Sequence, residues 1–338
     1  MSDSGRLIGV EEHFMLPELV SAMQQYLESP AAAGSGWREA GAALEDGARE
    51  RLGVRSMDLG AGRIAAMDVA GIDLQLLSLS TVANLQMLEP AEATALARVG
   101  NDGLAEGVGK HPSRFAGLAC LAPQDPGAAA AELERAVGRL GFRGVVINSH
   151  ARGEYLDAPR FAPIFEAAEA LGAPIYLHPA LLPAGAVEPY LDYGLMAAMW
   201  GYAADAGLHA LRIILSGTFD RYPGLQMVLG HLGEHIPFSL PRLDAHHAQT
   251  KAKTTPHLER RPSEYFREHF LVSTSGMNHA PASIRFCLEV MGPDRVLFAA
   301  DYPFEDLSEE VKAFAAVPLT DEERAALAHG NAERVFKL

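Results

Sequence analysis

The chain has 338 residues, of which 49% are hydrophobic, and its formal net charge is −15. This length and apolar content allow a large buried core. The acidic balance argues against a nucleic-acid partner, because phosphates attract Lys and Arg. No stretch approaches the roughly 20 apolar residues of a membrane helix, and the N-terminus has no cationic patch followed by an apolar region. We therefore expect a cytoplasmic protein that binds neither nucleic acid nor membrane.

Short apolar runs alternate with helical stretches along the chain. The expected strands are nearly continuous in Val, Ile and Leu, as in parallel strands buried on both faces: residues 6–12, 73–79, 115–120, 144–148, 174–178, 226–230, 270–274 and 295–300. The expected helices have helical apolar spacing or strong helix propensity: residues 90–110, 127–139, 160–171, 193–215, 234–247, 281–291, 307–315 and 320–329. This alternation predicts a TIM-type (β/α)8 barrel formed by residues 1–338 as a single domain. A doubly wound open sheet is the alternative.

Two segments have an irregular composition. Residues 29–55 combine a proline, glycines, alanines and mixed charges, and we expect an irregular insertion before the second strand. Residues 248–265 are basic and polar. In barrels such segments often cover the active face or a subunit contact, and a plain solvated loop is the alternative.

Polar residues stand where several of the apolar runs stop. Glu11 and His13 close the first run, and His178 closes the fifth. His231 and Asp301 follow the sixth and the eighth runs. Carboxylates and imidazoles are costly at the ends of buried strands unless they are paired or bound to a metal. Because the carboxyl ends of barrel strands point into one shared bowl, these side chains are expected to converge.

The residue types predict one divalent metal ion, held by Glu11, His13, His178 and Asp301. Glu11 and His13 are two positions apart, so they share a face of the strand, whereas Glu12 points the other way. Two carboxylates and two imidazoles suit Zn²⁺ and also tolerate Mn²⁺. No lysine follows a middle strand where it would suggest a carbamate bridge, which favours one metal over two.

For single residues, simpler interpretations stay open. Glu11 alone is as typical of an exposed strand-end charge as of a ligand. His231 lies in a Gly-His-Leu-Gly-Glu turn and is also compatible with a helix N-terminus that has no role.

Five segments, in chain order, resemble the amidohydrolase-2 family: Gly9-Val10-Glu11-Glu12-His13-Phe14, Ile175-Tyr176-Leu177-His178-Pro179, Ser216-Gly217-Thr218-Phe219-Asp220, Leu229-Gly230-His231-Leu232-Gly233-Glu234 and Asp301-Tyr302-Pro303-Phe304-Glu305. Within that family they are most similar to the non-oxidative hydroxybenzoate decarboxylases of the γ-resorcylate and 2,3-dihydroxybenzoate type. The Glu-Glu-His-Phe opening distinguishes this group from relatives that open with His-x-His.

The resemblance implies a (β/α)8 barrel with a single divalent metal in the four-residue shell named above. It also implies that His231 and Glu234 orient and tune Asp301. Arg242 falls where these enzymes place a substrate-binding arginine, often supplied across a dimer interface. A homodimer or homotetramer and a small aromatic carboxylic acid as substrate are therefore expected.

The implied reaction is non-oxidative decarboxylation of an ortho-hydroxyaryl carboxylate. Direct loss of CO₂ would leave a very basic aryl anion, so the ring carbon has to be protonated first. Asp301 is the expected acid, and His231 and Glu234 control its protonation through coupled titration. The metal would hold the carboxylate and the ortho hydroxyl and favour the phenolate. Phe304 and Trp200 are expected as apolar walls for the ring, with simple core packing as the alternative.

One segment departs from the decarboxylase pattern. Residues 274–280 read Thr-Ser-Gly-Met-Asn-His-Ala, whereas these enzymes usually carry Thr-Ser-Gly-Asn-Phe-Arg. The ring substituents of the substrate therefore stay open. Two other functions also stay open: hydrolysis of an amide, lactone or C–C bond by a metal-activated water whose proton Asp301 takes, and a barrel that only binds a small ligand.

Overall fold

The computed structural model describes residues 5–43, 46–249 and 258–338. Its strands are all parallel and form two hydrogen-bonded groups, one running from β1 to β3 and one from β4 to β9. Their bounds are β1 (Ile8–Phe14), β2 (Leu74–Leu79), β3 (Phe115–Gly117), β4 (Ala119–Cys120), β5 (Val145–Asn148), β6 (Ile175–His178), β7 (Met227–Leu229), β8 (Phe270–Ser273) and β9 (Val296–Leu297). Every strand residue is buried, as expected for a sheet covered on both faces.

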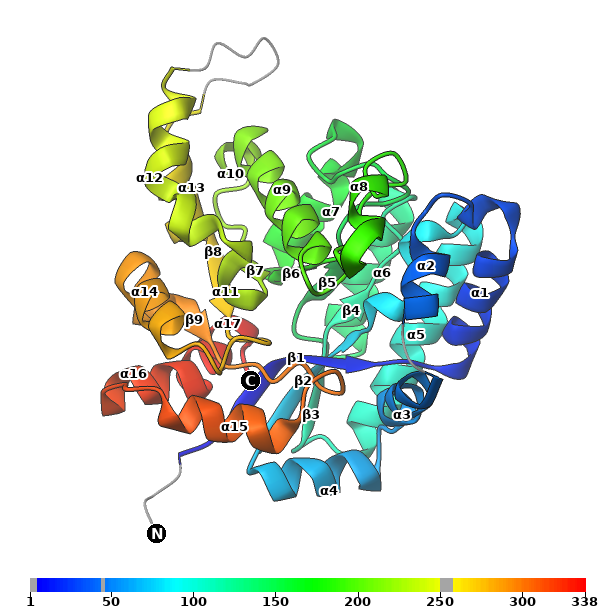
Figure 1. The fold of residues 1–338 in the computed structure, drawn as a ribbon, viewed down its shortest axis with the longest axis horizontal. Coiled ribbons are helices and arrows are strands. Elements are labelled where there is room, and N and C mark those ends of the chain that lie inside the picture. The colour runs from blue at the N-terminus through cyan, green and yellow to red at the C-terminus, as the bar shows by residue number, and fades with distance from the viewer. Residues whose placement is uncertain (1–4, 44–45, 250–257) are drawn as a thin grey trace.

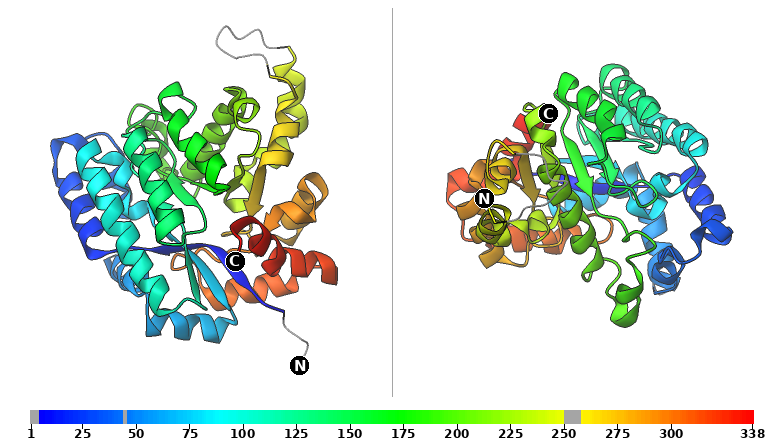
Figure 2. Two further views of the ribbon diagram at one scale, coloured as in Figure 1. Left: turned by 180° about the vertical axis from the view of Figure 1, so that it is seen from behind. Right: turned by 90° about the horizontal axis from the view of Figure 1, so that it is seen from above.

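Backbone hydrogen bonds outside the strand ladders join the two groups into a ring. β3 and β4 together form one strand of the barrel, and only Leu118 separates them. The N–H of Leu118 donates to Leu77 O at 2.9 Å. On the other side, β1 pairs with the chain that follows β9. Val10 N–H donates to Phe298 O at 3.2 Å, and Asp301 N–H donates to Glu11 O at 3.1 Å. The (β/α)8 barrel is thus confirmed, and the open-sheet alternative is wrong (Figures 1 and 2).

Helices surround the barrel (Figure 1). The longer ones are α1 (Pro17–Glu28), α3 (Asp46–Met57), α4 (Ala61–Ala70), α5 (Pro90–Lys110), α6 (Pro126–Arg139), α7 (Ala162–Leu171), α9 (Gly201–Leu215), α12 (Ile236–His247), α13 (Pro262–His269), α14 (Pro281–Met291) and α15 (Leu307–Ala316). The shorter ones are α2 (Trp37–Ala43), α8 (Glu188–Leu191), α10 (Thr218–Arg221), α11 (His231–Glu234), α16 (Asp321–Ala325) and α17 (Asn331–Phe336), with single turns η1 (Pro30–Ala32), η2 (Thr81–Ala83), η3 (Leu85–Met87), η4 (Pro159–Phe161), η5 (Asp192–Gly194), η6 (Pro293–Arg295) and the π-turn η7 (Ala326–Gly330).

Helix α6 shows how local sequence sets these elements. Asp125 accepts a hydrogen bond from Ala128 N–H at 3.0 Å, and proline fills the first helical position. Ala129, Leu133 and Ala136 then recur at helical spacing and face the core. None of the described helices combines the length and apolar character that crossing a lipid bilayer requires.

Two predicted helices begin later than expected because a residue with non-helical backbone precedes each of them. The helix expected over 193–215 begins at Gly201, after Trp200 with φ of −159°. The helix expected from residue 234 begins at Ile236, since His235 has φ of 64°. The helices α1, α4 and α13 were not expected.

The expectation of an irregular insertion over residues 29–55 is wrong. Most of this segment is helical, in η1, α2 and α3. Its alanines, leucines, arginines and glutamates favour helix strongly enough to outweigh the scattered glycines. In the basic segment 248–265, the structure describes α13 from Pro262 onward, and residues 250–257 lie outside the described part.

Candidate metal centre

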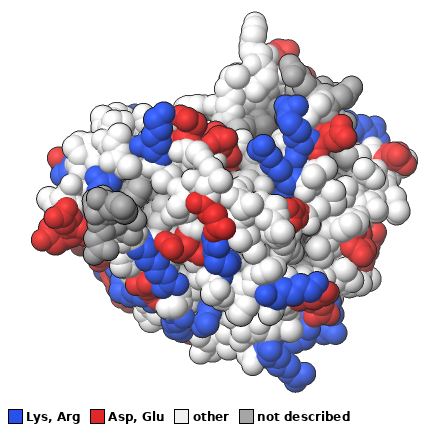
Figure 3. Space-filling view, turned by 90° about the horizontal axis from the view of Figure 1, so that it is seen from below, with Lys and Arg blue, Asp and Glu red and all other residues white. Residues whose placement is uncertain are grey.

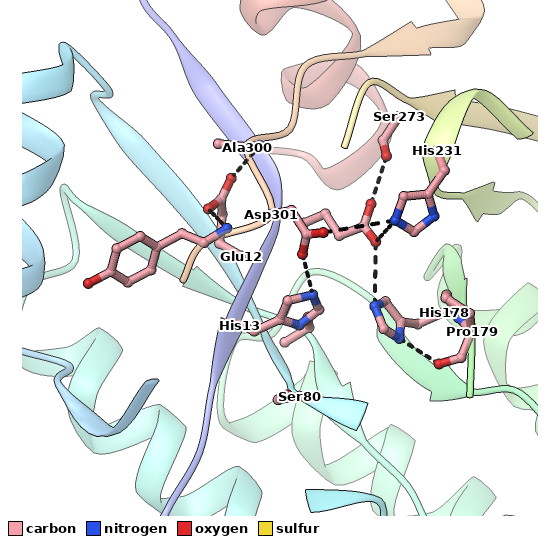
Figure 4. Close-up of polar contacts among 12 residues, drawn as sticks. Glu12, His13, Ser80, His178, Pro179, His231, Ser273, Ala300 and Asp301 are labelled. Atoms are coloured by element: carbon pink, nitrogen blue, oxygen red, sulfur yellow. Dashed lines mark hydrogen bonds and ion pairs between the residues drawn. The ribbon is translucent and has the colours of Figure 1, made fainter. Parts of the chain in front are cut away.

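Three of the predicted ligands converge at the mouth of the barrel, and Figure 4 shows two of them, His13 and His178. Glu11 and His13 come from β1, and His178 ends β6. One potential ligand atom from each lies within 4.8 Å of the others. The side chains are closed off from solvent, with residue exposures of 1%, 0% and 5% respectively. Segments that are distant in the sequence thus form one buried donor set.

Two donor atoms of this set make no hydrogen bond with the part of the protein that the structure describes. Among the described residues, neither Glu11 Oε1 nor His13 Nε2 has a hydrogen-bond partner, although both are buried. Burial raises the pKa of the Glu11 carboxyl and lowers the pKa of His178 well below its usual value. Unpaired buried polar groups are costly, and a divalent cation would supply the missing partner. The residues therefore fit Zn²⁺ or Mn²⁺, with neutral imidazoles and a carboxylate as ligands.

Hydrogen bonds from neighbouring residues orient Glu11 and His178 toward one point. Ser273 Oγ donates to Glu11 Oε2 at 2.8 Å, and Tyr176 OH donates to the same oxygen. His178 Nδ1 donates to Pro179 O at 2.9 Å, which leaves Nε2 free to bind a metal. Such partners fix the tautomer and the orientation of metal ligands.

Tyr176 and Ser273 were not predicted from the sequence as part of the site. Tyr176 lies two positions before His178, so alternation along the strand places both on the barrel interior. Ser273 ends the seventh apolar run in the same manner as the acidic and imidazole residues at the other strand ends. Both signals were present in the sequence, but a tyrosine and a serine are less conspicuous there than a charged group.

Asp301 lies next to Glu11, His13 and His178 but is not one of the three residues whose ligand atoms lie within 4.8 Å of one another. Its Oδ1 lies 3.2 Å from His13 Nε2, and its Oδ2 lies 3.9 Å from His231 Nε2. Burial alone would raise the pKa of Asp301, but the imidazoles of His13 and His231 hold it well below its usual range. Asp301 has a left-handed backbone, with φ of 62°, which is unusual for a residue with a side chain.

His231 lies between carboxylates. Its Nδ1 is 2.7 Å from Glu234 Oε1, and its Nε2 is 4.0 Å from Glu11 Oε1. Burial by itself lowers the pKa of His231, but the carboxylates of Glu234 and Glu11 raise it well above its usual value. The backbone is left-handed from His231 through His235, with φ between 50° and 82°. This tight turn after β7 points His231 and Glu234 toward each other, and strain of this kind clusters at functional sites.

The three predicted substrate residues lie at different distances from this centre. The ring of Phe304 is 5.6 Å from the ring of His13 and is 38% exposed, so it borders the mouth. Trp200 stacks on His235 at 5.1 Å, and no described contact joins it to the predicted ligands. Arg242 is exposed on α12 and makes no hydrogen bond or ion pair with the described residues.

A parallel barrel with buried carboxylate and imidazole groups at the carboxyl ends of its strands is the architecture of a metal-dependent barrel enzyme. Residues 30–338 match the amidohydrolase family, and the chain belongs to that family. It is similar to the γ-resorcylate decarboxylase of Rhodococcus jostii, with 35% identity over 98% of this chain and 98% of that protein.

Solved structures show the same similarity. The 5-carboxyvanillate decarboxylase from Sphingomonas paucimobilis is 40% identical with a TM-score of 0.93, covering 99% of this chain and 100% of that one. The 5-carboxyvanillate decarboxylase from Novosphingobium aromaticivorans, complexed with manganese and 4-hydroxy-3-methoxy-5-nitrobenzoic acid, is 37% identical with a TM-score of 0.94, covering 100% and 98%. The resemblance to aromatic-acid decarboxylases is thus confirmed.

Proposed function

We propose that the chain is a metal-dependent, non-oxidative decarboxylase of an ortho-hydroxyaryl carboxylate. The observation that carries this proposal is the convergence of two buried donor atoms that make no hydrogen bond with the described residues, on Glu11 and His13, beside His178 and Asp301. Similarity to γ-resorcylate and 5-carboxyvanillate decarboxylases, one of which is complexed with manganese, supports the proposal. Glu11, His13, His178 and Asp301 would hold the ion. When bound, it would supply Lewis acidity toward the carboxylate and ortho hydroxyl of the substrate.

Residues of the chain would hold the proton and transfer it to the substrate. The pKa of His231 is raised and the pKa of Asp301 is lowered, so the proton for the reaction would rest on His231 before it is transferred. Asp301 Oδ2, at 3.9 Å from His231 Nε2, would pass the proton to the ring carbon that carries the carboxylate. The bond to the carboxylate then breaks, CO₂ leaves, and the bonding electrons restore the aromatic ring. Glu234 would keep His231 oriented and charged.

The proposed partner is a small aromatic acid. Phe304 would form one apolar wall for the ring, and Trp200 a second wall farther out. On the face shown in Figure 3, basic and acidic side chains are interspersed rather than gathered by sign, which suits a small ligand better than a polyanion. A cytoplasmic location stays a prediction.

The test is turnover of a defined panel of acids by the manganese-loaded enzyme. The panel should include γ-resorcylate, 5-carboxyvanillate and a benzoate without the ortho hydroxyl as the negative control. We expect CO₂ release from at least one hydroxylated acid. In D₂O the product should carry one deuterium at the carbon that lost the carboxylate. Oxygen-18 from water in the product would instead indicate hydrolysis, and no turnover of any acid would contradict the proposal.

We propose further that Arg242 completes the site of a partner subunit. Figure 1 shows α12 extending away from the barrel, and the exposed Arg242 guanidinium pairs with no acid among residues 5–43, 46–249 and 258–338. Replacing Arg242 with alanine should lower kcat/KM by about 10- to 100-fold, as for loss of a charged hydrogen bond. Arg139→Ala, an exposed arginine on α6, is the matched control. Light scattering that shows a fully active monomer would contradict the cross-subunit role.

A further inference from the structure

Glu12 lies between two proposed metal ligands but on the opposite side of β1 (Figure 4). Its side chain is completely buried, with 0% exposure. It does not contribute to the donor set formed by Glu11, His13 and His178. A buried carboxylate outside the metal centre needs its own partners, and these partners indicate its role.

The Glu12 carboxylate binds the backbone on both sides of Asp301. Its Oε1 accepts a hydrogen bond from Ala300 N–H at 3.0 Å. Its Oε2 accepts one from Tyr302 N–H at 3.1 Å. These are the only partners of the two N–H groups among the described residues, because the chain leaves regular strand pairing after β9. One side chain therefore satisfies both N–H groups that flank Asp301.

A buried network holds Glu12 in this position. Gln75 Nε2 donates to Glu12 Oε2 at 3.1 Å, and Arg63 Nη1 donates to Gln75 Oε1 at 3.3 Å. The guanidinium of Arg63 lies 4.6 Å from the ring centre of Tyr302. On the other side of the carboxylate, Gly9 leaves the space it needs, since a Cβ there would lie 2.3 Å from Glu12 Oε1. Side chains from α4 and β2 thus fix the carboxylate against the loop that carries Asp301.

We propose that Glu12 is a positioning residue for Asp301. The left-handed conformation of Asp301, with φ of 62°, is unfavourable for a residue with a side chain and persists only where the surroundings enforce it. The two hydrogen bonds from Ala300 and Tyr302 to Glu12 provide that enforcement. They direct the Asp301 carboxylate toward His13 and His231 and place it over the bound ring. This role rests on the proposed function, in which Asp301 delivers the proton.

The test compares wild-type enzyme with Glu12→Gln in the manganese-loaded state. Glutamine has the same shape, but its amide group presents an N–H₂ to one of the two backbone N–H groups, so one of the hydrogen bonds is lost. We expect kcat to fall by about 100-fold, the cost of a misplacement of roughly 1 Å at a reacting group. KM should change less than threefold. Metal titration should show only a partial loss of Mn²⁺ affinity, because Asp301 is one of four proposed ligands, and kcat is therefore measured at saturating Mn²⁺. A kcat within threefold of wild type would overturn the proposal.

Leu133→Ala serves as the control for lost stability. Leu133 is fully buried on α6, away from the Asp301 loop, and its truncation leaves a cavity. If Leu133→Ala, at an equal fall in unfolding temperature, reproduces the drop in kcat, Glu12 has only a structural role. A normal kcat in Leu133→Ala together with a low kcat in Glu12→Gln supports positioning.

A crystal structure of Glu12→Gln tests the position of the Asp301 carboxylate independently of the enzyme's activity. We expect the Asp301 carboxylate to shift relative to His13 and His231 even if no acid in the panel is ever decarboxylated. A carboxylate that superposes on the wild-type position would overturn the positioning role whatever the enzyme's substrate. Absence of decarboxylation by the wild-type enzyme would instead contradict the proposed function alone.

Discussion

Replacing Asp301 with asparagine is expected to lower kcat by roughly 10²- to 10⁴-fold, the usual contribution of a general acid. The amide has nearly the same shape as the carboxylate but cannot take a proton from His231 Nε2, 3.9 Å away, and pass it to a ring carbon. The substrate should therefore still bind while the ring carbon is no longer protonated. Single-turnover measurement of CO₂ release separates the chemical step from binding and product release.

Two measurements complete this experiment. Metal content by elemental analysis distinguishes loss of the acid from loss of the ion, since Asp301 is also proposed as a ligand. Asp321→Asn makes the same chemical change at an exposed residue in the first turn of α16 and should leave kcat unchanged. An Asp301→Asn enzyme that keeps both its metal and more than a tenth of wild-type kcat would rule out Asp301 as the acid.

Removing the divalent ion with a chelator is expected to abolish turnover, and Mn²⁺ should restore it. Without the ion, Glu11 Oε1 and His13 Nε2 make no hydrogen bond with the described residues, so the apo enzyme should also be less stable. At a free metal concentration of about 100 times Kd, binding stabilises the folded state by about 2.7 kcal/mol. Calorimetry should therefore show a lower unfolding temperature for the apo enzyme.

His178→Ala tests the donor set directly. His178 Nε2 lies 3.5 Å from Glu11 Oε1, and its loss should weaken Mn²⁺ binding by more than the roughly 10- to 100-fold typical of outer partners. His111→Ala, at the end of α5, is the matched histidine control and should bind Mn²⁺ normally. Full activity after exhaustive chelation, or normal Mn²⁺ affinity in His178→Ala, would contradict a metal centre at this position.

Much of this centre could be predicted from strand ends alone. Glu11, His13 and His178 each follow or interrupt a short apolar run, and such polar endings are local features that a sequence displays directly. The sequence did not decide the role of Trp200, because an aromatic residue before a helix is compatible with a wall of the substrate pocket or with simple packing. In the structure it stacks on His235 instead of contacting the predicted ligands. The helices within residues 29–55 were missed because glycines obscured their propensity.

The sequence by itself determined the barrel and the residue types at its mouth, because apolar periodicity and polar strand ends depend on neighbours along the chain. Only the tertiary structure decided which atoms stay free to bind a metal. Glu11 receives hydrogen bonds from residues 165 and 262 positions away, and Glu12 binds N–H groups 288 and 290 positions away. Contacts over such separations follow from closure of the barrel, which brings the strand after residue 295 against the first strand. No local pattern in the chain encodes that closeness.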